Sequence, residues 1–292
     1  SNASGMDTFT YRVNDGTVNS SVATVTVNIN AINDNPAAVN DTAITAVNTP
    51  LVVAAHKLVA NDTDADGDTL YSTSILNGIN GSLAIDGANA VYTPTTDYTG
   101  SGSFQYTTKD GAGGTATGTV SVTVKAVSHS GSGTVTGDSG DNVLSGSSGV
   151  DTLDGGSGND LMYAGAGDDI LIYDGSDTHR VDGGAGTDVL QFSSSGESLD
   201  LSTINDSYFF NLYTGIEKID LTGSGNNSLT LDKHDVLNLS DTSDSLYVLG
   251  NSGDSVNGGS GWTDAGDDGD YSIYQSNEAT LYIDSDISVT FT

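Results

Sequence analysis

A nine-residue period runs from Gly137 to Gln191. Its first four rows read GDSGDNVLS, GSSGVDTLD, GGSGNDLMY and AGAGDDILI over residues 137–172. A further row, GGAGTDVLQ, occupies 183–191 after a degenerate ten-residue row at 173–182. Each of the five regular rows places Asn or Asp sixth and a large apolar residue eighth. One row could match by chance in a chain rich in Gly and Asp, but five rows nearly in register could not, so the period decides the fold here.

The order of small, acidic and apolar residues within a row predicts its backbone. Six residues form a glycine-rich turn, and the next three form a short strand that points one side chain inward. Two rows complete one coil, so turns 18 residues apart stack on the same side of a parallel β-roll, a right-handed β-solenoid. The inward side chains are those at position eight: Leu144, Leu153, Met162, Leu171 and Leu190.

The acidic residues at position six form two columns in this arrangement. Asp151, Asp169 and Asp188 line one side of the roll, and Asn142 and Asp160 line the other. Ca²⁺ takes about six to eight oxygen ligands from carboxylates and carbonyls, so it suits the space between stacked turns, and the adjacent pairs predict roughly two to four ions. The predicted ligands in the rows are Asn142, Gly146, Ser148, Asp151, Gly155, Ser157, Asp160, Ala164, Ala166, Asp169, Gly183, Ala185 and Asp188.

The composition favours bound cations over a merely solvated acidic surface. The 292-residue chain carries 39 Asp+Glu against 7 Lys+Arg, a net charge of -32, with 38 Gly and no Cys. All but three of the acids are Asp, whose short arm suits carboxylates held close to a turning backbone. A halophile-like surface would scatter Asp and Glu without a period. The charge balance excludes nucleic-acid binding through a basic face, the lack of Cys excludes thiolate sites, and no run approaches the roughly 18 apolar residues of a membrane helix.

A second, longer repeat occupies the first part of the chain. DTFTYRVNDG at 7–16 matches GSFQYTTKDG at 102–111, and TVTVNI at 24–29 matches TVSVTV at 119–124, both at an offset of 95. Apolar residues alternate with polar ones in about seven short segments, which predicts an antiparallel β-sandwich. The predicted segments are a cloning remnant at 1–3, the last strands of a preceding repeat at 4–32, a complete repeat at 33–127 and a linker at 128–136.

Two acidic stretches in the complete repeat are candidate calcium loops. NDNP at 33–36 lies between the two copies, and NDTDADGD at 61–68 places three Asp at alternate positions before Gly67. That spacing matches the first half of an EF-hand loop, but Thr73 stands where the final Glu belongs, so this is not an EF-hand. The alternative is a solvated acidic turn. The candidate ligands are Asp34, Asp62, Asp64, Asp66 and Asp68.

Both repeats resemble those of known families. The 95-residue repeat resembles the cadherin-like tandem repeats of large bacterial surface proteins, and its NDNP junction resembles the calcium-binding linker of cadherins. The nonapeptides match the RTX, or hemolysin-type, calcium-binding signature. Together with the phrases GIEKIDLTGSGNNSLTL, DVLNLSD and GSGW, they resemble the C-terminal region of a large RTX adhesin. The resemblance implies type I secretion through an uncleaved C-terminal signal, and a place outside the cell or on its surface.

The segment 192–292 is expected to extend the solenoid without calcium turns and to end in a β cap formed by residues 271–292. Its apolar pairs recur about every ten residues: Leu199 and Leu201, Phe209 and Leu212, Ile219 and Leu221, Leu229 and Leu231, Leu237 and Leu239, and Leu246 and Val248.

The predicted function follows from these parts. The chain carries no GxSxG, P-loop or HExxH motif, so we expect no enzyme. We expect a calcium-binding module of a secreted adhesin that folds on calcium binding and supports cell adhesion or biofilm attachment. Two alternatives stay open: a calcium-dependent glycan-binding tip, with Trp262 as a stacking platform, or the calcium-binding tail of a secreted RTX enzyme. No nucleic acid partner and no membrane insertion are expected.

Overall fold

The structure is a computed structural model that describes residues 4–175, 179–203, 212–240 and 243–292. These ranges are built mainly from β-strands, with few helices, as the alternating apolar pattern predicts. None of the helices in the described ranges is long and apolar enough to cross a membrane.

Residues 33–127 fold as two sheets packed face to face, as the alternating pattern predicts. Tyr92 and Phe104 stack between the sheets with ring centroids 5.9 Å apart, and Tyr106 beside them is fully buried. One sheet has the order β3-β9-β8-β5 and the other β4-β7-β6. β3 runs parallel to β9, whereas all other pairs are antiparallel as expected. The elements are β3 (Asp41–Ala46), β4 (Leu51–Ala54), η1 (Lys57–Val59), β5 (Tyr71–Ile79), β6 (Gly81–Asp86), β7 (Asn89–Pro94), β8 (Gly100–Lys109) and β9 (Thr115–Lys125).

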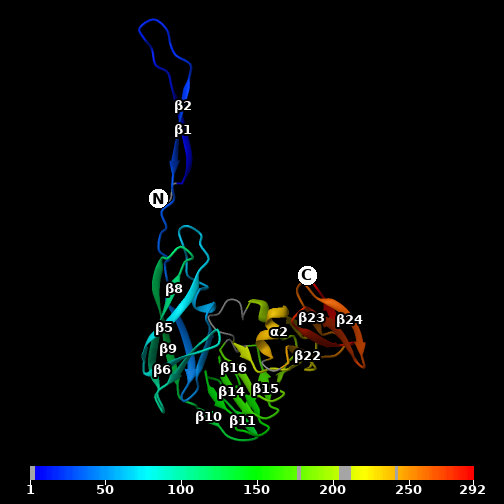
Figure 1. Ribbon diagram of the computed structural model, residues 1–292. Coiled ribbons are helices and arrows are strands. Elements are labelled where there is room, and N and C mark those ends of the chain that lie inside the picture. Colours follow the sequence, from blue (N-terminus) through cyan, green and yellow to red (C-terminus); the bar gives the residue numbers. More distant parts are fainter. Residues whose placement is uncertain (1–3, 176–178, 204–211, 241–242) are drawn as a thin grey trace.

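A separate hairpin, β1 (Gly5–Tyr11) with β2 (Ala23–Ile29), extends away from the sandwich (Figure 1). Phe9 pairs with Val25 in this hairpin, and Phe104 pairs with Val120 in β8–β9, so the two hairpins share one register at an offset of 95. Phe9 is 56% exposed, whereas Phe104 is 1% exposed. The hairpin therefore presents an apolar face that a complete sandwich buries.

The nonapeptide region, residues 137–191, alternates between two parallel sheets. One sheet has the order β10-β12-β14-β16-β19, and the other begins β11-β13-β15-β17-β20-β22-β26. Paired residues lie 18 or 19 apart, as Leu153 with Leu171 and Leu171 with Leu190. The strands are β10 (His129–Ser130), β11 (Thr134–Thr136), β12 (Val143–Ser145), β13 (Thr152–Asp154), β14 (Leu161–Ala166), β15 (Ile170–Tyr173), β16 (Val181–Ala185), β17 (Val189–Phe192), β19 (Tyr213–Thr214), β20 (Lys218–Asp220), β22 (Ser245–Leu249) and β26 (Thr280–Asp284).

Position eight of every regular row points inward: its five apolar side chains are each fully buried. The predicted linker at 128–136 contains β10 and β11, which are the first strands of both sheets. Ala46 of β3 is buried with Val143 and Leu161 of the nonapeptide region, and Tyr163 packs against them. The sandwich and the nonapeptide sheets are thus in apolar contact.

Beyond Gln191 the coils lengthen, the first sheet ends with β19, and a third parallel sheet has the order β18-β21-β23-β27. Leu199 pairs with Leu229, Leu229 with Val256 and Val256 with Val289, so one coil takes 27 to 33 residues here. The strands are β18 (Ser198–Asp200), β21 (Ser228–Thr230), β23 (Ser255–Asn257) and β27 (Ser288–Thr290). Phe209 of the predicted ladder lies outside the described residues.

The prediction of a strand through Leu237 and Leu239 is wrong, because residues Lys233–Leu239 form the helix α2. Asp232 accepts hydrogen bonds from N–H groups of the first turn, and Asp235 accepts one from the Asp232 N–H. This capping box satisfies the donors that a helix start leaves unpaired, and it outweighs the alternating pattern of the segment.

The chain ends in a cap of antiparallel strands, β24 (Thr263–Asp268) and β25 (Tyr271–Gln275), that continue the sheet of β26. Every residue of the outer strand β24 is exposed, and Asp264, Asp267 and Asp268 give it negative charge. Charge on an edge strand discourages pairing with another chain. Strands β25, β26 and β27 lie within residues 271–292, for which the capping role stays a prediction.

Candidate calcium-binding loops

The acidic residues at position six stack in two columns, grouped as the 18-residue period predicts. The Asp151 N–H donates to Asp169 Oδ1 at 2.7 Å, and the Asp169 N–H donates to Asp188 Oδ1 at 2.8 Å. On the other side, the Asn142 N–H donates to Asp160 Oδ1 at 2.7 Å. Each carboxylate therefore holds the turn of the neighbouring coil.

The second oxygens of two carboxylates have a different environment. Asp169 and Asp188 are fully buried, and in the described part of the chain their Oδ2 atoms have no hydrogen-bond partner. Burial raises the pKa of Asp188 to about 7 against the hydrogen bond from the Asp169 N–H. Burial also raises the pKa of Asp169 and of Asp160. Buried, unsatisfied carboxylate oxygens are costly for a fold, and a bound cation removes that cost.

Asp151, at the first end of its column, is satisfied by the protein itself. Its Oδ2 accepts from the Ser147 N–H at 2.6 Å and the Ser147 hydroxyl at 2.8 Å, and its Oδ1 accepts from the Gly133 N–H. Burial opposes ionisation here, but these hydrogen bonds outweigh it and lower the pKa of Asp151. The buried carboxylate oxygens that have no hydrogen-bond partner in the described ranges thus lie further along the column, at Asp169 and Asp188.

Glycine is required where one turn touches the next. At Gly165 φ is +110° and at Gly184 it is +89°, in the left-handed region that favours glycine. A Cβ on Gly165 would collide with the Ser147 carbonyl oxygen, and a Cβ on Gly184 with the Gly165 carbonyl oxygen. Main-chain carbonyl oxygens of one turn are therefore packed against glycines of the next turn, which places hard oxygen ligands between the coils.

The first-position residues also face each other across coils. A Cβ on Gly146 would collide with the carbonyl oxygen of Ala164, and a Cβ on Gly137 would collide with that of Gly155. The Ala185 carbonyl accepts from Gly167 N–H at 2.9 Å, and Ala166 N–H donates to the preceding turn. Ser148 and Ser157 lie on the same turns, and their role as carbonyl ligands stays a prediction. Most of the candidate calcium ligands are thus main-chain carbonyl oxygens. The described residues contain no group of three or more His, Cys, Asp or Glu side chains placed to hold a metal ion.

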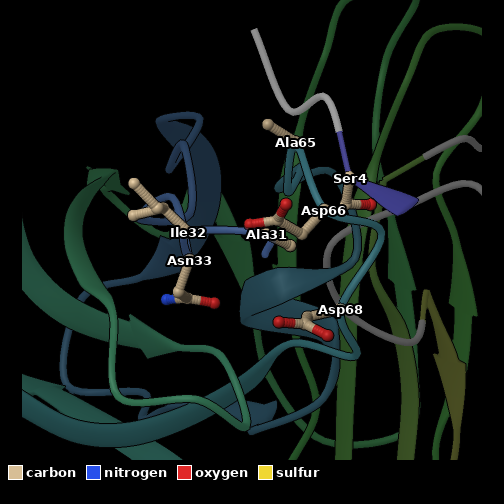
Figure 2. A pocket seen from close by; sticks show the side chains of 7 residues that line it. All are labelled: Ser4, Ala31, Ile32, Asn33, Ala65, Asp66 and Asp68. Atoms are coloured by element: carbon tan, nitrogen blue, oxygen red, sulfur yellow. The ribbon is translucent and has the colours of Figure 1, made fainter. Parts of the chain in front are cut away.

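In the sandwich, the structure brings two of the predicted acidic stretches together. The Asp34 N–H donates to Asp66 Oδ2 at 2.7 Å, and the Asp66 N–H donates to Asp64 Oδ1 at 2.8 Å. Asn33, Asp66 and Asp68 help to line a pocket of about 500 Å³, and their side chains are shown in Figure 2. The junction and the acidic loop are therefore one site-like surface, at the base of the N-terminal hairpin.

Asp62 points to a different place, where sequence reasoning missed a neighbour. Its Oδ1 accepts from the Val39 N–H at 2.7 Å and the Tyr106 hydroxyl at 3.0 Å. Asp41, only 6% exposed, lies nearby: burial raises its pKa to about 6, against a hydrogen bond from Asn61. Asp41 begins strand β3, and no spacing marks it in the sequence.

Asp110 is a second missed residue. Its Oδ1 accepts from three N–H groups, those of Ala112, Gly113 and Gly114, and its Oδ2 accepts from Asn33 Nδ2 at 2.9 Å. The Asn33 hydrogen bond is the main reason that the pKa of Asp110 is lowered. The DG pair at 110–111 was visible as part of the 95-residue repeat, but its contact with the junction was not.

The aromatic residues of the C-terminal part pack within the cap. Trp262 Nε1 donates to the Gly258 carbonyl at 2.6 Å, and the Tyr274 ring lies 4.6 Å from the Phe291 ring. Trp262 and Tyr274 are partly buried against the core. These contacts favour a packing role over a sugar-stacking platform.

The fold and these loops define the class: an all-β protein with an Ig-like sandwich and acidic, glycine-rich loops suited to calcium. Residues 33–123 match the bacterial Ig domain family, and residues 136–171 match the RTX calcium-binding nonapeptide repeat in four copies. The chain therefore contains a bacterial Ig domain followed by RTX repeats, and these repeats bind Ca²⁺. Such domains are typically non-catalytic and typical of extracellular or secreted proteins, so the chain is a calcium-binding module of extracellular type.

Similarities to solved structures are partial. A nucleoside hydrolase-related hypothetical protein from Saccharophagus degradans is 18% identical over 32% of this chain and 26% of its own, with a TM-score of 0.26. An endo-fucoidan hydrolase of glycoside hydrolase family 107 is 20% identical over 42% of this chain and 19% of its own, with a TM-score of 0.23. The chain thus spans about a quarter or less of the length of these proteins, and TM-scores this low bear on neither fold nor function. No curated protein matches the chain.

Proposed function

We propose that this chain is the calcium-dependent C-terminal module of a secreted bacterial surface adhesin, with residues 137–191 forming an RTX β-roll. The observation that carries the proposal is the column of buried carboxylates between stacked glycine turns. Asp169 and Asp188 each accept a hydrogen bond from the preceding coil with one oxygen and keep the other buried without a protein donor in the described ranges. That arrangement is costly without a cation and favourable with one.

Calcium then acts as the switch between an unfolded and a folded roll. The chain has a net charge of -32, and stacking its carboxylates without cations opposes folding by mutual repulsion. Each Ca²⁺ neutralises two of these charges, and its binding free energy becomes folding free energy. Extracellular calcium modules typically bind with Kd of about 10⁻⁴ to 10⁻³ M, so the roll stays unfolded inside the cell and folds outside it.

This switch fits export by a type I secretion system, which threads an unfolded chain. The bacterial Ig domain before the roll, and the second hairpin in the same register, support a tandem array that gives reach from the cell surface. Adhesion or biofilm attachment is the role that such reach serves, with the roll as the part that folds at the exit.

The calcium switch is tested by titrating the purified chain with Ca²⁺ and following strand content by circular dichroism, with excess chelator as the reference. The double variant D169N/D188N is expected to raise the calcium midpoint by about tenfold or more, because two ligand charges are lost. The matched control is D267N/D268N, which removes the same charge from the exposed strand β24. Equal strand content and equal melting temperature with calcium and with chelator would overturn the switch.

Export is tested separately with a reporter fused before residue 1 and coexpressed with type I secretion machinery. The proposal expects the reporter outside the cell, folded only when the medium contains calcium. A reporter retained in the cytoplasm would contradict the secretion step and leave calcium binding untouched.

A further inference from the structure

A turn outside the nonapeptide rows occupies the next place in the calcium column. Strand β16 pairs with β19 so that Asp182 lies opposite Thr214, which puts Gly215 in the place after it, as Gly183 follows Asp182. A Cβ on Gly183 would collide with the Gly215 carbonyl oxygen, just as a Cβ on Gly146 would collide with that of Ala164. Gly215 is therefore a first-position residue of one more stacked turn, which the nine-residue period does not reveal.

Glu217 takes the role that Asp has at position six. Its Oε2 accepts from the Asp188 N–H at 2.9 Å, as Asp188 Oδ1 accepts from the Asp169 N–H. Strand β17 pairs with β20 directly after it, with Val189 opposite Lys218. The turn from Gly215 to Glu217 is three residues long instead of six, and the extra methylene of Glu lets its carboxylate reach the same place from this shorter turn.

An unsatisfied oxygen points into this last turn. Asp188 is fully buried, and its Oδ2 has no hydrogen-bond partner in the described ranges. A Cβ on Gly183 would lie 2.8 Å from Asp188 Oδ2 and would also collide with the Gly215 carbonyl oxygen. A carboxylate oxygen and a carbonyl oxygen thus converge beside Gly183, with the buried Glu217 carboxylate on the same column. These are hard oxygen ligands of the kind that Ca²⁺ prefers.

We propose that Asp188, Glu217 and the Gly215 carbonyl hold a further Ca²⁺ that closes the calcium stack, beyond the nonapeptide repeats. This inference rests on the proposed function of the roll. It makes the turn at 214–217 a terminal calcium site that joins the metal-dependent coils to the longer coils after them.

Two turns of the next column along the chain are closed by groups of the protein itself. The Glu197 N–H donates to Asn227 Oδ1 at 2.9 Å, and the Asn227 N–H donates to Asp254 Oδ1 at 2.8 Å. Asn227 Nδ2 also donates to the Leu221 carbonyl at 3.0 Å, and Asp254 Oδ2 accepts from Asn251 N–H at 2.8 Å. Asn227 and Asp254 are thus satisfied by an amide and main-chain groups, whereas Glu197 at the start of this column keeps Oε1 buried without a hydrogen-bond partner in the described ranges.

The number of bound Ca²⁺ per chain, counted by native mass spectrometry and isothermal titration, tests the inference. E217Q keeps an oxygen that can accept from the Asp188 N–H and is expected to bind one Ca²⁺ fewer than the wild type. The matched control D254N makes the same change in the amide-closed column and is expected to keep the full number. An unchanged number in E217Q, with the wild type binding several ions, overturns this site and leaves the proposed function standing. A wild type that binds none overturns the proposed function itself.

A measurement on the unaltered chain covers the case in which E217Q fails to fold. Crystals grown in Ca²⁺ are expected to give an anomalous difference peak in contact with Asp188 Oδ2 and the Glu217 carboxylate. Peaks between the earlier turns but none at this position would overturn the terminal site.

Discussion

The sandwich and the nonapeptide region have opposite kinds of interior. In the sandwich, aromatic and branched side chains from two sheets meet, with Tyr92, Phe104 and Tyr106 fully buried. In the nonapeptide region, each row gives one inward apolar side chain, and fully buried carboxylates such as Asp169 and Asp188 lie beside that ladder. The first interior is stabilised mainly by apolar burial. The second interior is thin and carries buried carboxylates, so the proposed function predicts that the nonapeptide region depends on bound cations far more than the sandwich does.

The largest expected effect is a regional loss of structure on calcium removal. Hydrogen exchange of the full chain, read by mass spectrometry, should show residues 137–191 protected in millimolar Ca²⁺ and unprotected in excess chelator, because the carboxylate columns repel without cations. Residues 33–127 should stay protected in both conditions. Magnesium at the same concentration is the control, since it demands a smaller octahedral cage and dehydrates reluctantly. Equal protection of both regions in chelator would break the comparison.

Core truncations sharpen the same contrast. Phe104→Ala should destabilise the sandwich by about 3–5 kcal/mol and leave the calcium midpoint unchanged. Leu171→Ala should cost the roll about 2–5 kcal/mol and raise the calcium midpoint, because more binding free energy is needed to fold it. Thermal melting in chelator reports the sandwich, and the calcium titration reports the roll. A Leu171→Ala midpoint equal to that of the wild type would mean that calcium binding and packing of the roll are not coupled.

The periodic parts of this molecule were predictable from sequence, and the parts that depend on contacts across the chain were not. The 18-residue period placed Asp151, Asp169 and Asp188 in one column because two rows per coil fix which turns stack. Glu217 was missed because a three-residue turn after a coil of 29 residues has no period to reveal it. The helix α2 was missed because its capping box competes with an apolar pattern that also fits a strand. The parallel pairing of β3 with β9 depends on tertiary contacts that no local pattern encodes.

Acid should act on the two regions with opposite sign. Burial raises the pKa of Asp41 in the sandwich to about 6, so the folded state takes up a proton that the unfolded state releases, and stability is lost as pH rises through about 6. In chelator, the sandwich melting temperature should therefore rise as pH falls from 7 to 5. In the roll, the pKa of Asp188 is raised to about 7, so protons compete with Ca²⁺ in this window.

The calcium midpoint of the roll should accordingly increase as pH falls from 7 to 5, while the sandwich becomes more stable. Asp41→Asn removes the titrating group and should flatten the pH dependence of the sandwich without changing that of the roll. Parallel pH trends in the two regions would show that the buried carboxylates of the roll are not calcium ligands.

The smallest effect on stability is expected from the N-terminal hairpin, which tests whether the sandwich comparison extends to its second copy. Phe9 and Tyr11 are 56% and 50% exposed, whereas their counterparts Phe104 and Tyr106 are buried. An isolated two-stranded hairpin is marginal in water, so we expect it to pack on a neighbouring chain. Sedimentation of the full chain should show concentration-dependent association that is lost when residues 4–31 are deleted, with both melting transitions unchanged.

The double variant F9S/Y11S is the matched control for that deletion, because it keeps the backbone and removes only the apolar face. It should abolish association to the same degree. NMR signals of a freely mobile hairpin at concentrations where the chain is otherwise folded would contradict the expectation. The apolar face of the hairpin would then stay exposed to water. The identical register of β1–β2 and β8–β9 would reflect the sequence repeat alone, because the turn and the residue alternation of a hairpin set its own strand pairing.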